Sequence, residues 1–163
     1  MIFNRDRLLL LKPIKDMEKT KLSEHGVSYG LSEAGYDIRV AQDIRFGVKM
    51  DTPMVQCGDN LRVGRFTLAS TMEEFQMPRS LVGIVHDKST WARRGLSVFN
   101  TVIEPGWNGF LTLELVYHGQ EELIIPAGSG IAQVIFHELI VDAAYDGKYQ
   151  NQEEGPQAAR KSV

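Results

Sequence analysis

The sequence predicts a single, mainly β domain of the sandwich, barrel or jelly-roll type with a short N-terminal helix. Its 163 residues are the length of one domain. Short runs along the chain alternate between apolar and polar residues, as half-buried strands do. The breaks between these runs carry Gly, Pro, Asn or Asp, which favour turns. Short strands with turn signals at this spacing are typical of all-β architectures.

The elements follow in order along the chain. Residues 2–12 are expected to form the helix, with Asn4 as its cap. Residues 15–21 carry mixed charge and indicate a loop or a frayed helix, whereas residues 26–35 are rich in Gly and Ser and indicate a turn. Residues 88–94 are expected to form one helical turn. The expected strands are 36–40, 43–50, 62–69, 81–86, 96–99, 109–117, 122–125 and 131–138.

The end of the chain differs in composition from the rest. Residues 146–163 are mostly polar and contain almost no apolar side chains. Such a segment cannot bury enough surface to remain ordered alone. We therefore expect one β domain over residues 1–145 and a flexible tail over 146–163 that orders on a ligand or a neighbour.

Charge and cysteine content exclude several classes of function. With 18 Lys and Arg against 21 Asp and Glu, the net charge is −3, which argues against broad binding of nucleic acid or anionic membrane. Cys57 is the single cysteine, and no two of the four histidines have metal-ligand spacing, so no zinc signature is present. P-loop and Rossmann motifs are absent as well. The apolar run 8–11 is too short for a signal peptide or a membrane span, so a cytoplasmic protein is expected.

Residues 88–95 (Lys-Ser-Thr-Trp-Ala-Arg-Arg-Gly) are the first candidate for chemistry. They place two hydroxyl groups, on Ser89 and Thr90, among the three cations Lys88, Arg93 and Arg94. Hydroxyl and backbone N–H groups at the start of a helical turn suit a phosphate, and nearby cations add charge. A capped helix with a solvated basic face explains the same pattern.

Two further stretches carry carboxylates. The turn at 103–109 brings Glu104 close to Trp107, a pair that suits a sugar or base, although an ordinary hairpin also fits. Glu114 shares one strand face with Thr112 and Val116. On a wet face Glu114 is a solvated charge, whereas in a partly buried pocket desolvation raises its pKa toward that of a general base.

Several segments of the chain, taken in their order along the sequence, resemble those of the dCTP deaminases. These are trimeric enzymes of pyrimidine deoxynucleotide metabolism in the dUTPase-like superfamily. The resemblance runs from residue 28 to about 156 and is carried by residues 28–30, 35–39, 88–93, 103–109, 113–115, 130–133 and 147–152. It implies a dUTPase-like distorted jelly roll or β-barrel. It also implies a homotrimer whose active sites are shared between subunits.

The resemblance implies an activity and its catalytic groups. Glu114 matches the general base that activates the water attacking cytosine C4, and Ser89 and Arg93 match residues that line the reaction centre. The substrate would be a deoxycytidine nucleotide, with Mg²⁺ accompanying the triphosphate and no zinc. The matching nucleotide-binding positions are Lys88, Thr90, Thr101, Val102, Glu104, Trp107, Gln133, Tyr145, Lys148, Tyr149 and Gln152.

Among these positions Glu104 would read the 3′-hydroxyl and Trp107 would pack on the sugar. Lys148, Tyr149 and Gln152 of the tail, joined by Tyr145, would close over the nucleotide as a lid. The chain departs from the family pattern at Val102, where Ala or Pro is usual, and in the short spacing between Tyr145 and Lys148. Residues 14–28 also match poorly.

Three functions remain open at this stage. The first is zinc-independent hydrolysis of dCTP to dUTP and ammonia. The second is a dUTP pyrophosphatase, with Glu104 as its base, or a bifunctional enzyme that performs both steps. The third is a nucleotide-binding regulator on the same fold that lacks catalysis.

Overall fold

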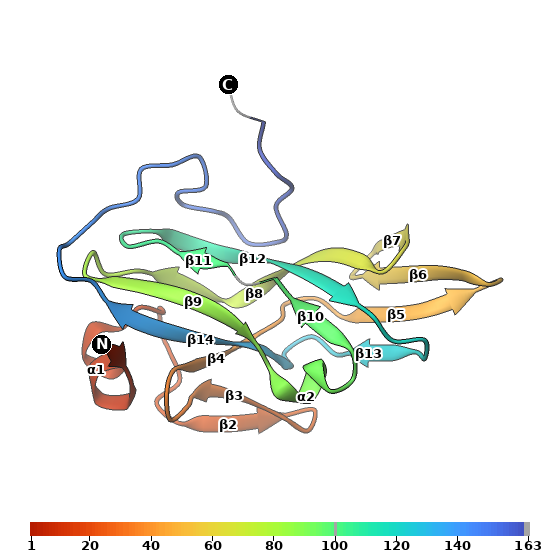
Figure 1. Ribbon diagram of the computed structural model, residues 1–163, viewed down its shortest axis with the longest axis horizontal. Coiled ribbons are helices and arrows are strands. Elements are labelled where there is room, and N and C mark those ends of the chain that lie inside the picture. Colours follow the sequence, from red (N-terminus) through yellow and green to blue (C-terminus); the bar gives the residue numbers. More distant parts are fainter. Residues whose placement is uncertain (100, 162–163) are drawn as a thin grey trace.

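Antiparallel sheets make up most of the regular secondary structure (Figure 1). The computed structural model describes residues 1–99 and 101–161, and within these ranges the strands form three sheets. The largest has the order β11-β9-β14-β4-β3-β2, with β1 paired to β14. Its strands are β1 (Ile2–Phe3), β2 (Lys21–Glu24), β3 (Val27–Leu31), β4 (Tyr36–Arg39), β9 (Leu81–Asp87), β11 (Val102–Ile103) and β14 (Gly130–Glu138).

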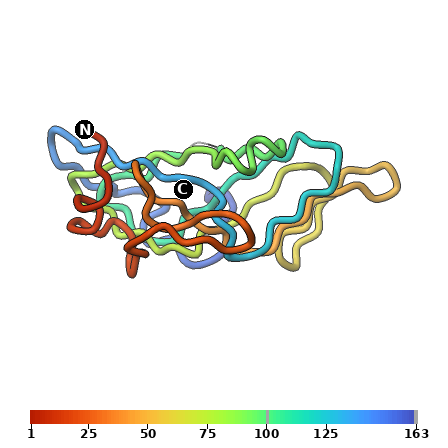
Figure 2. Tube along the Cα trace, turned by 90° about the horizontal axis from the view of Figure 1, so that it is seen from below, coloured from red at the N-terminus to blue at the C-terminus, as the bar shows by residue number. Residues whose placement is uncertain are grey.

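The other two sheets are smaller. One has the order β10-β12-β8 and contains β8 (Phe66–Gln76), β10 (Leu96–Val98) and β12 (Asn108–Tyr117). The other has the order β13-β5-β6-β7 and contains β5 (Ile44–Lys49), β6 (Thr52–Cys57), β7 (Asn60–Val63) and β13 (Leu123–Ile125). The β5–β6 hairpin projects from one end of the molecule (Figure 2). This mainly β, jelly-roll-like architecture confirms the expected fold class, although the sheets do not close into a barrel.

Most expected strands are present, but residues 26–35 are not a turn. Lys21–Glu24 and Val27–Leu31 pair as a hairpin, with its turn at 25–26. The glycines are needed for close packing of the backbone. A Cβ at Gly30 would lie 2.5 Å from the Thr20 carbonyl oxygen, and one at Gly35 would lie 2.2 Å from that of Val134. Glycine here allows neighbouring backbone segments to approach closely. The sequence prediction interpreted the same glycine-rich composition as a turn.

Two other boundaries also differ from the sequence prediction. The expected strand 62–69 is split at Gly64, whose φ of +110° ends β7 and lets β8 begin at Phe66. No strand was expected between residues 50 and 62, but β6 lies there and includes Pro53, which pairs with Val48 beside the hairpin turn. The two-residue strand β11 is too short to show a period in the sequence.

Both helices lie within the expected ranges 2–12 and 88–94, but residues 2–3 form strand β1 instead of helix, and Asn4 makes no side-chain cap. α1 (Arg5–Leu11) starts directly after Asn4, whose side-chain amide donates to the Glu33 carbonyl oxygen (3.0 Å) instead of capping the helix. Leu8 is fully buried and fixes α1 on the core. α2 (Ser89–Ala92) is a single turn with no side-chain cap. Residues 15–20 form the expected loop.

Strand β12 positions the candidate site. Leu111, Leu113 and Leu115 on one face are buried, whereas the alternate residues, Glu114 among them, are half-buried. β12 pairs along its length with β8, and its register shifts between Phe110 and Thr112. The described part of the tail crosses over β12 (Figure 1). Residues 162–163 of the expected tail lie outside the described ranges.

Candidate functional site

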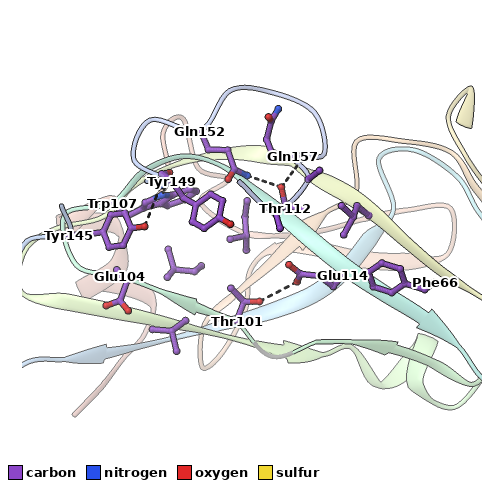
Figure 3. A pocket seen from close by; sticks show the side chains of 16 residues that line it. Phe66, Thr101, Glu104, Trp107, Thr112, Glu114, Tyr145, Tyr149, Gln152 and Gln157 are labelled. Carbon is purple, nitrogen blue, oxygen red and sulfur yellow. Dashed lines mark hydrogen bonds between the residues drawn. The ribbon is translucent and has the colours of Figure 1, made fainter. Parts of the chain in front are cut away.

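A cavity of about 530 Å³ lies between the half-buried face of β12 and the tail (Figure 3). It is lined by eight of the fourteen residues that the sequence analysis assigned to the site: Thr101, Val102, Glu104, Trp107, Glu114, Tyr145, Tyr149 and Gln152. The cavity is mostly apolar, with a few polar groups converging on it, which is the usual character of a small-molecule site.

Glu114 is the half-buried carboxylate of this cavity. Burial raises its pKa above the usual value, while hydrogen bonds from its own backbone N–H and from Thr101 act in the opposite direction. Thr101 Oγ1 lies 3.4 Å from Glu114 Oε2 (Figure 3). The Glu114 backbone oxygen accepts from the Phe99 N–H (3.0 Å). The carboxylate is therefore oriented and only partly solvated, as a general base requires.

The turn before β12 places Glu104 and Trp107 at the same cavity. Gly106 has a φ of +74°, and the Trp107 N–H donates to the Glu104 carbonyl oxygen (3.1 Å), which closes the turn. The Glu104 side chain is exposed, and the Trp107 ring is buried. The indole Nε1 donates to the Tyr149 carbonyl oxygen (2.6 Å) (Figure 3).

Backbone pairing joins the tail to β12. Gln152 forms a parallel bridge with Gly109, and its carbonyl oxygen accepts from the Phe110 N–H (2.9 Å). The Gln152 side-chain amide donates to Phe110 O (2.8 Å) and to Thr112 Oγ1 (2.7 Å). Gly109 has a φ of +130°, and a Cβ there would lie 2.5 Å from the Gln152 backbone. Glycine is thus required for this close contact.

Tyr145 and the other tail candidates also form hydrogen bonds beside the cavity. The Tyr145 N–H donates to Pro105 O (2.7 Å), and Tyr145 Oη accepts from the Tyr149 N–H (3.3 Å). Lys148 Nζ donates to the Arg160 carbonyl oxygen (2.7 Å). Lys148 itself is not among the cavity-lining residues.

The candidates on α2 do not line this cavity. Ser89, Thr90 and Arg93 are exposed, and α2 lies away from the tail (Figure 1). Lys88 at the start of α2 is occupied by protein partners, since its Nζ donates to Asp37 Oδ2 (2.6 Å) and to Ser28 Oγ (3.0 Å).

Gln133 is also outside the cavity. It lies on β14, and its side-chain amide donates to Ser32 Oγ (2.9 Å). Within one chain, the sequence candidates therefore fall into two groups, one around Glu114 and one around α2.

Several cavity residues were missed by the sequence analysis. Thr112 shares the face of Glu114, so strand alternation could have identified it. Nothing local indicates the others, because they reach the cavity through strand pairing and the path of the tail. They are Phe66, Leu68, Ile103, Leu111, Gln157, Ala158 and Ala159.

The side chains and helices of residues 1–99 and 101–161 bear on the requirements of a metal site and of a membrane span. Their His, Cys, Asp and Glu side chains form no group of three or more that could hold a metal ion. None of their helices has the length and apolar character needed to cross a membrane.

Several solved structures with a similar fold are dUTPases. The native EIAV dUTPase matches with a TM-score of 0.53 at 20% identity, covering 83% of this chain and 91% of that chain. A dUTPase of Staphylococcus bacteriophage 80alpha matches with a TM-score of 0.54 at 14% identity, covering 83% and 94%. The chain therefore has a dUTPase-like fold.

Sequence comparison is more specific than the fold. The profile of the family described as dCTP deaminase-like matches residues 56–139. A dCTP deaminase of Protochlamydia amoebophila is 36% identical, covering 88% of this chain and 87% of the relative. A dCTP deaminase of Cupriavidus taiwanensis is 39% identical, covering 77% of each chain. With a family profile spanning half its length and relatives of this similarity, the chain belongs to the dCTP deaminase-like family.

Proposed function

We propose that the protein hydrolyses dCTP to dUTP and ammonia without zinc, with Glu114 as the general base. The observation that carries this proposal is the half-buried Glu114 carboxylate, with its raised pKa, in the same cavity as Glu104 and Trp107. The relatives named dCTP deaminase support the choice of substrate.

The reaction needs one water and one base. Glu114 takes a proton from the water, and the resulting hydroxide attacks C4 of the cytosine. The C4–N bond then breaks, and the amino group leaves as ammonia with the transferred proton. A positioned base contributes about 10²–10⁴-fold, so orientation and donors aimed at the tetrahedral intermediate supply the rest.

The other cavity residues would bind the deoxynucleoside. Glu104 is free to accept the 3′-hydroxyl, because its side chain is exposed beside the cavity. Trp107 would pack on the sugar, and the backbone at Thr101 and Val102 would face the base. Mg²⁺ would accompany the triphosphate, whose oxygens are the hard ligands it prefers. With dCTP as substrate, we place the protein in the cytoplasm.

We also propose that the tail, residues 146–163, acts as a lid on the β domain, residues 1–145. Tyr145, Lys148, Tyr149 and Gln152 would close over the nucleotide. The support is the bonding of this segment to Trp107 and β12. Closure would exclude bulk water from the reaction centre.

A homotrimer would unite the two groups of candidates. Ser89, Thr90 and Arg93 are exposed on α2, outside the cavity of their own chain. At the cavity, Phe66 and Val102 are large apolar side chains that are 43% and 53% exposed. A neighbouring subunit that covers this rim could supply α2, together with Lys88 and Gln133, to the site.

Incubation of the purified protein with dCTP and Mg²⁺, with all products resolved, tests the proposal. Ammonia with dUTP is the expected result. Ammonia with dUMP and pyrophosphate would indicate a bifunctional enzyme. If dUMP forms only from added dUTP, the protein is a pyrophosphatase, and binding without turnover of either nucleotide would indicate a regulator.

A further inference from the structure

Arg160 links the end of the described tail to its beginning. Its guanidinium Nη1 donates to the Lys148 carbonyl oxygen, and Lys148 Nζ donates in return to the Arg160 carbonyl oxygen (2.7 Å). Each cation therefore binds the backbone of the other residue. The pair closes residues 148–160 into a loop.

The same arginine fixes Tyr149, which lines the cavity. The Arg160 N–H donates to Tyr149 Oη (3.2 Å). Arg160 Cζ lies 5.6 Å from the centre of the Tyr149 ring, and Lys148 Nζ lies 5.2 Å from it. Two cations thus contact one aromatic ring, each within the range of a cation–π interaction.

Tyr149 in turn contacts the site from the opposite side. Its carbonyl oxygen accepts the Trp107 indole N–H (2.6 Å), and its own N–H donates to Tyr145 Oη (3.3 Å). Near the end of the loop, the Gln157 N–H donates to Thr112 Oγ1 (3.0 Å), two residues from Glu114. The loop is thus anchored at Trp107 and Thr112, and Arg160 closes it.

We propose that Arg160 is a positioning residue that holds the tail closed over the cavity before nucleotide binds. We call the contacts of Arg160 with Lys148 and Tyr149 the clasp. Without the clasp, the segment that carries Lys148 and Tyr149 would populate open conformations, and only the closed conformation binds the nucleotide tightly. The apparent affinity for the nucleotide is the affinity of the closed conformation multiplied by the fraction of molecules that are closed. The chemical step at cytosine C4 is unaffected once the nucleotide is bound. Only the expected change in the kinetics with dCTP rests on the proposed function; the closed position of the tail does not.

Three variants test whether the specific contacts of Arg160, and not its positive charge alone, hold the tail closed. Arg160→Ala removes the guanidinium group, and with it both the hydrogen-bond donors and the positive charge. Arg160→Lys keeps the charge but loses the planar guanidinium that donates to Lys148 O while lying over Tyr149. Lys161→Ala is the matched control, because it removes the same charge one residue further along the chain.

The first readout uses the protein without nucleotide and so does not depend on activity. Chymotrypsin should cut after Tyr149 faster in Arg160→Ala and Arg160→Lys than in the unchanged chain or in Lys161→Ala. The tryptophan emission should shift to the red in the same two variants, because an open tail uncovers Trp107. Equal cleavage rates and unchanged emission would overturn the clasp even if the protein proved not to be a deaminase.

The second readout is the kinetics with dCTP. Arg160→Ala and Arg160→Lys should raise KM by about tenfold while kcat changes little, as expected for loss of a pre-closed conformation. Lys161→Ala should behave like the unchanged chain. If Arg160→Lys keeps the original KM, or if Lys161→Ala raises it equally, charge alone accounts for the effect and the clasp is wrong.

Discussion

Glu114 shows how much one residue's role depends on its surroundings. The sequence identified the face of β12 on which this side chain lies, because strand alternation is a local property. It could not show whether that face is wet, since the covering groups come from the tail and from Thr101. The structure places the carboxylate half-buried, with a raised pKa.

Replacement of this carboxylate tests its chemical role. Glu114→Gln keeps the size and hydrogen-bonding groups of the side chain but removes the basic oxygen. We expect nucleotide binding to persist and ammonia release to fall by about 10²–10⁴-fold. Binding is measured by calorimetry and turnover by ammonia assay. Retained turnover in Glu114→Gln would contradict the assignment of the base.

The pH dependence of the reaction tests the hydrogen bond to Thr101. Glu114 must be ionised to act as a base, so kcat/KM should fall as the pH decreases through its raised pKa. The Thr101 hydroxyl stabilises the ionised form and lowers this pKa. Thr101→Val should therefore move the acid limb of the profile to higher pH.

Thr101→Ser provides the control for this shift. It keeps the hydroxyl group, so its acid limb should coincide with that of the unchanged chain. An acid limb that stays in place in Thr101→Val would show that the 3.4 Å contact has no influence on the base.

At the scale of elements, the sequence predicted most strands because their alternation is local. It failed where glycine serves packing between strands that are distant in sequence. Gly35 lies against the Val134 carbonyl oxygen, and Gly130 against that of Ser28. The tail is a similar case, because its partners Gly109 and Trp107 lie about forty residues earlier.

Truncation tests the tail as an element. A chain that ends after Gly147 loses the contacts to Trp107 and β12, so its KM for dCTP should rise by about tenfold or more. A chain that ends after Lys161 keeps these contacts and serves as the control. Steady-state kinetics measure the effect, and size-exclusion chromatography verifies that assembly is unchanged. Unaltered kinetics after truncation at Gly147 would show that the tail is not a lid.

At the scale of the whole molecule, the two groups of candidate residues raise the question of assembly. Glu114 lines the cavity, whereas Ser89 and Arg93 are exposed on α2 outside it. No pattern along one chain shows which residues of different copies meet. The family resemblance supplied the expectation of a trimer, and in the single chain Ser89 and Arg93 do not line the cavity of Glu114.

Mixing two inactive variants tests this sharing of sites. Glu114→Gln and Arg93→Ala should each be inactive alone, since each site would lack one group. If the site joins two chains, random mixed trimers contain some sites with both groups intact, about one quarter of the total. Activity should therefore reappear after the variants are unfolded and refolded together. Continued inactivity in verified mixed trimers would place both residues in the site of one chain.

The bonds between the tail and β12 also have a consequence for product release. Donor and acceptor in these bonds are protein groups, such as Trp107 Nε1 with Tyr149 O and Gln152 Nε2 with Phe110 O. A covered product can leave only after such bonds break, and segment opening can limit turnover. Under the proposed function, a tail held more tightly than in this chain would bind dCTP better and would slow the release of dUTP until opening limited turnover. The strength of these few bonds would then set a compromise between affinity for the substrate and the rate of turnover.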